Sequence, residues 1–106
     1  MRNEYEVVLS ELAQNDLEDI VVYISKELNE PSIALRVYDK IVSEMETLST
    51  MPERHEVDFK LIFESFAVRK LYVDNYIAPY IIDGNNVVIL RVLYSKRDLI
   101  KLIGTN

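Results

Sequence analysis

Cationic side chains near the C-terminal end of the sequence could bind an anion. They occur at Arg69-Lys70, at Arg91 and at Lys96-Arg97, each beside an apolar stretch typical of a β-strand. Guanidinium and ammonium groups hold phosphates and carboxylates through charge-assisted hydrogen bonds. We therefore take Arg69, Arg91, Lys96 and Arg97 as candidate residues for binding a partner or an anion.

Lys96 and Arg97 come where a helix is predicted to start. Ser95 and Asp98 precede the apolar residues of 99–103 with the spacing of a capping box. Cations in a first helical turn are disfavoured by the helix dipole, by roughly a few tenths of a kcal/mol each. Free amides together with two cations would form a local anion site, for a phosphate or an acidic side chain. A solvated Lys-Arg pair is the alternative, and the sequence leaves both open.

The other cations have structural interpretations beside functional ones. Arg91 interrupts an apolar run over 87–94, and a charge inside a buried strand must be paired. We expect an acidic partner from a helix; the alternative is that Arg91 faces outward and meets a carboxylate of another protein. Arg69 and Lys70 are neighbours in a predicted strand, so they point to opposite faces and at most one joins any given patch.

Groups that could transfer a proton are few. Tyr94 could act as an acid or stack on a base, although an aromatic packed on the helices is the favoured interpretation. The single histidine, His55, lies in a predicted loop and is either catalytic or, as we favour, a surface residue. The sequence has no cysteine, which excludes disulfides and thiolate metal sites, and we expect neither metal nor cofactor.

The charge of the chain is unevenly distributed. The net charge of the 106 residues is −6, with 11 acids against 4 bases in residues 1–50 and 6 bases against 3 acids in residues 67–106. An acidic helical half would repel a phosphate backbone, so we expect no binding of free nucleic acid. No run approaches the roughly 18 apolar residues of a membrane span, and the N-terminus lacks an apolar leader. We expect a cytoplasmic protein without membrane contact.

The length of the chain predicts a single domain, residues 1–106, and the spacing of its apolar residues predicts the order of helices and strands. A strand over 4–9 is followed by a helix capped by Ser10, a break at 29–32 and a second helix ending near Thr50. Residues 53–66 are ambiguous, either a partly packed loop or a short extra element. Three strands follow, at about 67–73, 75–82 and 87–94, and Pro79 marks an edge strand or a bulge.

The prediction is an α+β fold of order β-α-α-β-β-β, an antiparallel sheet packed against a helical hairpin, with a short C-terminal helix. That final helix, 99–103, is expected to pack on its own sheet or else to belong to a groove that a partner covers.

In this order and spacing the chain resembles toxins of the RelE/ParE superfamily from bacterial type II toxin–antitoxin modules. No single motif is specific, but together they cover nearly the whole length. The N-terminal residues that carry the resemblance are Val8-Leu9-Ser10, Ala13, Asp16-Leu17, Ile20, Tyr23-Ile24, Pro31 and Ala34. The C-terminal ones are Arg69-Lys70-Leu71, Asn75-Tyr76, Tyr80, Asp83 and the run from Ile89 to Tyr94.

The resemblance implies a toxin that is neutralised by a wrapping antitoxin protein, forming a hetero-oligomer. RelE-like members cleave mRNA on the ribosome, whereas ParE-like members poison DNA gyrase. RelE-like enzymes usually carry an arginine directly after the middle-strand tyrosine, and here Ile77 follows Tyr76. RNA cleavage needs a proton acceptor, a proton donor and cations on the phosphate. The candidates for those roles are Arg97, Tyr94 and Lys60, an incomplete set.

Three hypotheses follow from the resemblance. The leading one is a ParE-like toxin that inhibits DNA gyrase by protein–protein contact and causes growth arrest without catalytic residues of its own. The second is a ribosome-dependent mRNA endonuclease, so enzymatic activity is left open. The third is a non-toxic module that only binds its antitoxin.

Overall fold

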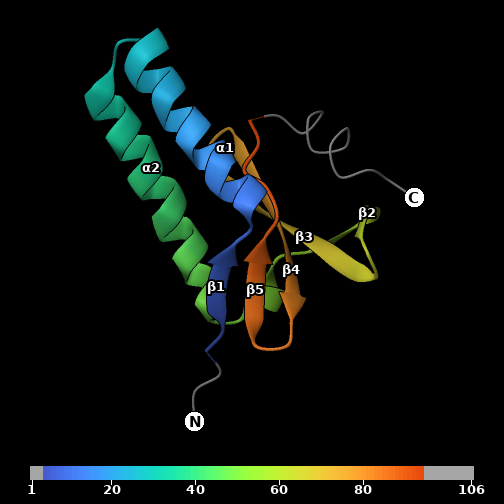
Figure 1. The fold of residues 1–106 in the computed structure, drawn as a ribbon. Helices are drawn as coiled ribbons and strands as arrows, with labels where there is room; N and C mark the ends of the chain where they lie inside the picture. The colour runs from blue at the N-terminus through green and yellow to red at the C-terminus, as the bar shows by residue number, and fades with distance from the viewer. Residues whose placement is uncertain (1–3, 95–106) are drawn as a thin grey trace.

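The computed structural model describes residues 4–94, which form a five-stranded sheet with two helices on one face (Figure 1). The strands lie in the order β1-β5-β4-β3-β2. Among residues 4–94, no helix combines the length and apolar character needed to cross a membrane. The α+β class is thus confirmed. The main elements are β1 (Glu6–Leu9), α1 (Glu11–Val22), α2 (Pro31–Glu46), β2 (Val57–Phe63), β3 (Phe66–Val73), β4 (Tyr76–Asp83) and β5 (Asn86–Ile89).

The helical hairpin forms as its caps predict. Ser10 is the N-cap of α1, and its hydroxyl accepts a hydrogen bond from the amide of Ala13 at 3.0 Å. After α1 the chain continues through one π-helical turn, Tyr23–Glu27, before Asn29 adopts a left-handed φ of 57° that ends it. Asparagine tolerates this conformation, and Pro31 then begins α2, where its missing amide costs nothing.

The sheet is mixed rather than wholly antiparallel, which corrects one detail of the prediction. β1 pairs in parallel with β5, whereas the other three pairings are antiparallel. The two helices form the crossover between β1 and the rest of the sheet. The parallel pairing joins segments that are far apart in the sequence, and the periodicity of apolar residues does not show which strands pair.

Residues 53–66 supply the extra element that the sequence left ambiguous. After two short 3-10 turns, Thr47–Ser49 and Pro52–Arg54, the chain enters β2, the edge strand that forms a hairpin with β3. The β2–β3 register shifts between Val57 and Ile62, so the alternation expected of a strand is broken. That irregularity is why the segment did not look like a strand.

Pro79 was predicted to mark an edge strand or a bulge in its own strand; the structure has a bulge opposite Pro79, in the chain that follows β5. β4 is an interior strand, so the edge alternative is wrong. Tyr80 pairs with Ile89, and Ile77 forms a β-bridge with Leu93. Between these two pairs the chain advances three residues along β4 but four residues along the opposite chain. This extra residue ends β5 at Ile89, earlier than the predicted end at residue 94. Proline has no amide to contribute to a ladder, which suits the interrupted pairing.

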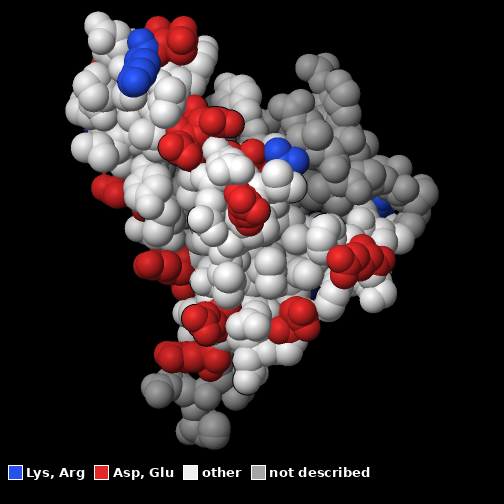
Figure 2. Space-filling view, viewed as in Figure 1, with Lys and Arg blue, Asp and Glu red and all other residues white. Residues whose placement is uncertain are grey.

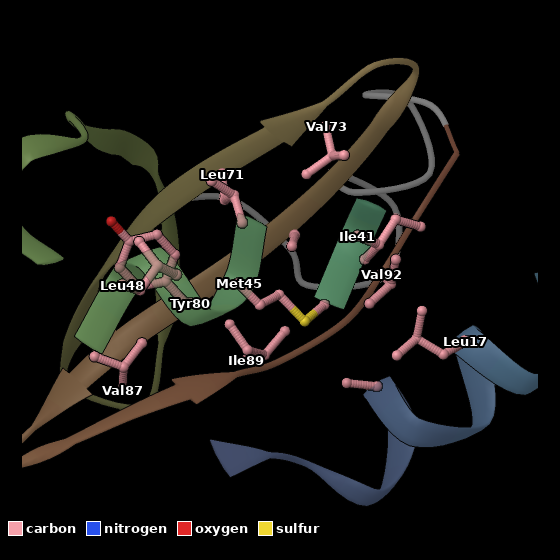
Figure 3. Packing of buried hydrophobic residues seen from close by; sticks show 12 residues of the cluster. Leu17, Ile41, Met45, Leu48, Leu71, Val73, Tyr80, Val87, Ile89 and Val92 are labelled. Carbon is pink, nitrogen blue, oxygen red and sulfur yellow. The ribbon is translucent and has the colours of Figure 1, made fainter. Parts of the chain in front are cut away.

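The apolar residues form two clusters, one on each face of the sheet. The larger lies between the helices and the sheet, where Figure 3 shows Ile41 and Met45 beside Ile89 and Val92. The smaller lies on the face away from the helices; it is called the second-face cluster below. It consists of Leu61, Val68, Ile77, Ile81, Leu90 and Leu93. The predicted C-terminal helix lies outside the described residues.

Candidate functional site

The bulge after β5 is organised by a carboxylate of α1. Asp16 accepts two hydrogen bonds from Arg91, from Nε at 2.8 Å and from Nη2 at 3.0 Å, and a third from the amide of Val92 at 2.9 Å. The side chains of Arg91 and Asp16 are only 18% and 14% exposed. The hydrogen bond to Asp16 raises the pKa of Arg91 despite its partial burial. The expected pairing of Arg91 with a helix acid is therefore confirmed, and this guanidinium is engaged inside the fold.

Arg69 and Lys70 are also engaged, and on opposite faces of the sheet as their adjacency predicts. Nη1 of Arg69 donates to the carbonyls of Glu53 and His55, at 3.0 and 2.6 Å, and so fastens the loop before β2. Lys70 forms an ion pair with Asp58 at 2.8 Å. Burial lowers the pKa of Lys70, but the hydrogen bonds and charges of Asp58 and Tyr72 together outweigh it, so the pKa is raised.

His55 is not the surface residue that the sequence favoured. Its ring meets Tyr80 edge-on at 6.2 Å, and its Nε2 is buried with no hydrogen-bond partner among the described residues. Burial lowers the pKa of His55, and the nearby charges of Arg54 and Arg69 lower it further, against a small opposing effect of Glu44. The neutral ring is thus part of the loop packing.

This burial makes stability depend on pH. Because the folded protein takes up the His55 proton at a lower pH than the unfolded chain, unfolding binds protons as pH falls through about 6.5. The free energy of unfolding should therefore decrease from pH 7.5 toward pH 5.5. Urea unfolding of the protein and of H55Q across this range measures the effect. A slope that is as steep in H55Q as in the parent would refute the assignment to His55.

Of the three residues proposed for RNA cleavage, the two that the structure describes, Tyr94 and Lys60, are not gathered into one site. Arg97 lies outside the described residues. Tyr94 is 62% exposed rather than packed on the helices, and it contacts the ring of Tyr76 edge-on at 5.5 Å, beside the end of β3 at Val73. Lys60 is an exposed residue of β2, which pairs only with the first half of β3. The usual distance between neighbouring strands and the usual rise per residue along a strand place Lys60 and Tyr94 roughly 20 Å apart.

Two apolar hollows flank the helical hairpin, and the sequence reasoning missed them. One, of about 640 Å³, is called the tyrosine hollow; it lies where α1 and its π-helical turn meet the start of β4. The other, of about 620 Å³, is called the outer hollow and lies between α1, α2 and the end of β1. The tyrosine hollow is lined by Asp19, Ile20, Tyr23, Ile24, Leu28, Ile33, Tyr76 and Tyr94. The outer hollow is lined by Leu9, Gln14, Leu17, Glu18, Val21, Val22, Leu35 and Tyr38.

Exposed apolar side chains in these hollows are the signal that could have revealed them. Tyr23, Leu28 and Leu35 are 56%, 51% and 63% exposed, although Tyr23 and Leu35 lie in helical segments and Leu28 directly follows the π-helical turn. Large apolar residues outside that stripe indicate a contact surface. Acidic side chains predominate on the face seen in Figure 2.

One family model matches most of the sequence. Residues 7–99 match the family model described as the ParE toxin of the type II toxin–antitoxin system parDE. The chain belongs to the ParE toxin family. It is therefore the toxin component of a type II toxin–antitoxin system. No curated protein matches the sequence.

Solved structures agree with the ParE fold. A chain of the chromosomal ParDE system from P. aeruginosa superposes with a TM-score of 0.71 at 22% identity, covering 89% of this chain and 99% of the other. A chain of the RelBE2 toxin–antitoxin complex from Mycobacterium tuberculosis gives a TM-score of 0.60 at 26% identity, covering 86% and 91%. Both branches of the superfamily thus share the fold of this ParE-family toxin, so the fold does not distinguish their targets.

Proposed function

We propose that this ParE-family toxin inhibits DNA gyrase by protein–protein contact, and that a cognate antitoxin neutralises it. The observation that carries the proposal is the environment of Ile77. Its side chain is 5% exposed within the second-face cluster, and its backbone exchanges hydrogen bonds with Leu93 at 2.7 and 2.9 Å. The resemblance places an arginine of mRNA-cleaving toxins at this position, and a buried isoleucine can neither bind phosphate nor transfer a proton.

The arrangement of the other candidate residues also favours contact over catalysis. Arg69 and Arg91 hold the loop before β2 and the bulge, respectively, and Tyr94 and Lys60 lie far apart. An mRNA endonuclease would need a proton acceptor, a proton donor and a phosphate-binding cation within reach of one nucleotide. That alternative makes its own prediction: R97A would abolish its toxicity. A toxin that acts through a protein surface would retain most of its toxicity in the same variant.

We further propose that the antitoxin covers the tyrosine hollow. The two structures compared above are of toxin–antitoxin systems, and a hollow of this size with exposed aromatic residues suits an apolar helix or extended segment. Asp19 at its rim and the acidic surface of the helices favour a segment that carries lysine or arginine. Lys96 and Arg97 remain candidates for an acidic part of the same partner. The proposed partners place the toxin in the cytoplasm.

Expression of the toxin alone in bacterial cells tests the proposal. A gyrase inhibitor arrests growth and induces the SOS response while translation continues, because trapped gyrase damages DNA. Collapsed translation with intact DNA would contradict the proposal and favour mRNA cleavage. Normal growth at a verified level of folded toxin would favour the non-toxic antitoxin-binding module. Co-expression of the cognate antitoxin serves as the control, because it should restore growth in either toxic case.

A further inference from the structure

We propose that the tyrosine hollow contains a cation site, in which an arginine side chain of the antitoxin lies between tyrosine rings and against the carboxylate of Asp19. The inference rests on the antitoxin docking proposed above and adds the chemistry by which this hollow selects its partner. Four side chains of the lining form the site. They are Asp19, Tyr23, Tyr76 and Tyr94.

Two of the rings form a fixed pair on the sheet side of the hollow. Ile77 and Leu93 form an antiparallel β-bridge, and their backbones exchange hydrogen bonds at 2.7 and 2.9 Å. In that register Tyr76 and Tyr94 are directly opposite each other, and their rings meet edge-on with centroids 5.5 Å apart. The backbone therefore positions both rings before any ligand binds, which lowers the entropic cost of binding.

α1 and its π-helical turn supply the helix side of the hollow. Asp19 and Tyr23 are four residues apart, so their side chains lie on one face of this helical segment. Tyr23 is 56% exposed and Tyr94 is 62% exposed, although both line the hollow. Their aromatic surface is accessible, so a ligand that enters the hollow can contact rings from the helix and from the sheet.

The combination of aromatic faces with one carboxylate favours a cation. An aromatic ring attracts a cation over its face, because the π-system carries partial negative charge there. Asp19 adds a full negative charge, and in the described part of the chain its carboxylate forms no hydrogen bond or ion pair. Asp16, about one turn earlier on α1, is instead bound to Arg91. Asp19 is thus available to a ligand, whereas Asp16 is not.

The same groups favour arginine over other ligands. The Asp19 carboxylate would repel a phosphate, which argues against a nucleotide stacked on the rings. A guanidinium group can stack on an aromatic ring while it donates two hydrogen bonds to a carboxylate, and it is more weakly hydrated than the ammonium group of lysine. Within residues 4–94, the cation that lies over a tyrosine ring is Lys70, 5.5 Å from the centroid of Tyr72 and outside the hollow.

Titration of the free toxin with N-acetylarginine methylamide tests the cation site, with the NMR signals of the tyrosine rings as the readout. The signals of Tyr23, Tyr76 and Tyr94 should shift, whereas those of Tyr72 should not. The citrulline analogue is the matched ligand, because its urea group has a similar shape and no charge. It should bind at least about fivefold more weakly. Equal binding of the two ligands, or shifts that leave the hollow unaffected, would overturn the site.

Matched variants test which groups hold the cation. Y94L removes a ring but keeps an apolar side chain, whereas Y94F keeps the ring. Y94L should weaken binding of the arginine analogue at least about fivefold, and Y94F less than about twofold. D19N and E18Q remove equal charge from adjacent positions of α1, but Glu18 lines the outer hollow, so D19N should weaken binding more. If Y94L binds as Y94F does, or E18Q loses as much as D19N, the proposed contacts are wrong.

Calorimetric titration with the cognate antitoxin tests whether this partner uses the site. Its affinity should fall in Y94L and D19N and stay near that of the parent in Y94F and E18Q. If L28D weakens binding but Y94L and D19N do not, the antitoxin docks in the hollow without an arginine in the site, which overturns this inference alone. If none of the three weakens binding, the docking itself is wrong. Gyrase takes no part in these measurements, so they are separate from the test of the target.

Discussion

Replacing Asp16 with alanine is expected to lower the free energy of unfolding by about 2–4 kcal/mol. The carboxylate accepts three hydrogen bonds in a partly buried position, two from Arg91 and one from the amide of Val92. Its removal leaves a guanidinium and an amide without their acceptor, and breaking one partner of a buried ion pair costs about 3–5 kcal/mol. The remaining exposure of both side chains reduces this cost, because water can replace part of the lost contact.

Urea unfolding followed by circular dichroism measures this loss. E18A is the matched control, because Glu18 is an exposed acid on the same helix, and its effect should stay within about 0.5 kcal/mol. R91M should cost less than D16A, since Asp16 would still accept the amide of Val92. If D16A costs less than 1 kcal/mol, or no more than E18A, then Asp16 does not hold the bulge.

Placing a charge in the tyrosine hollow is expected to weaken antitoxin binding at least about 100-fold. Leu28 lines this hollow and is 51% exposed, so L28D would remove an apolar contact and take a carboxylate out of water on complex formation, while changing the free toxin little. A central apolar contact of an interface is commonly worth 2 kcal/mol or more, and about 2.7 kcal/mol corresponds to 100-fold in affinity.

Calorimetric titration of each toxin variant with the cognate antitoxin measures this effect. M51D is the matched control, because Met51 is a 70% exposed apolar residue in the loop before β2, outside both hollows. It should bind as the parent does. If L28D binds with unchanged affinity, or M51D loses as much, then the antitoxin docks elsewhere.

The sequence predicted those parts of the fold that depend on interactions between residues close together in the chain. Ser10 caps α1 and Pro31 begins α2, because caps and proline preferences act within one turn. Pro79 indicated an irregularity in the sheet, because proline has no backbone amide to donate to a hydrogen bond between strands. Arg91 was expected to meet a helix acid, but only the three-dimensional fold identifies Asp16 among the many acids of the helices.

Features built from distant segments could not be predicted in the same way. The parallel β1–β5 pair and the edge strand β2 depend on partners many residues away. The tyrosine hollow joins Tyr23 to Tyr76 and Tyr94, which no single periodic stretch connects. His55 looked like a loop residue on the surface, yet the loop folds back on Tyr80 and buries its Nε2.

The most direct test of the proposed function is a supercoiling assay with purified DNA gyrase, relaxed plasmid and this toxin. We predict loss of supercoiling or accumulation of cleaved plasmid as toxin is added, with activity restored by the cognate antitoxin. In parallel, mRNA on programmed ribosomes should remain intact at the same toxin concentration. Full supercoiling with no trapped cleavage at high toxin, together with cut mRNA, would contradict the proposal.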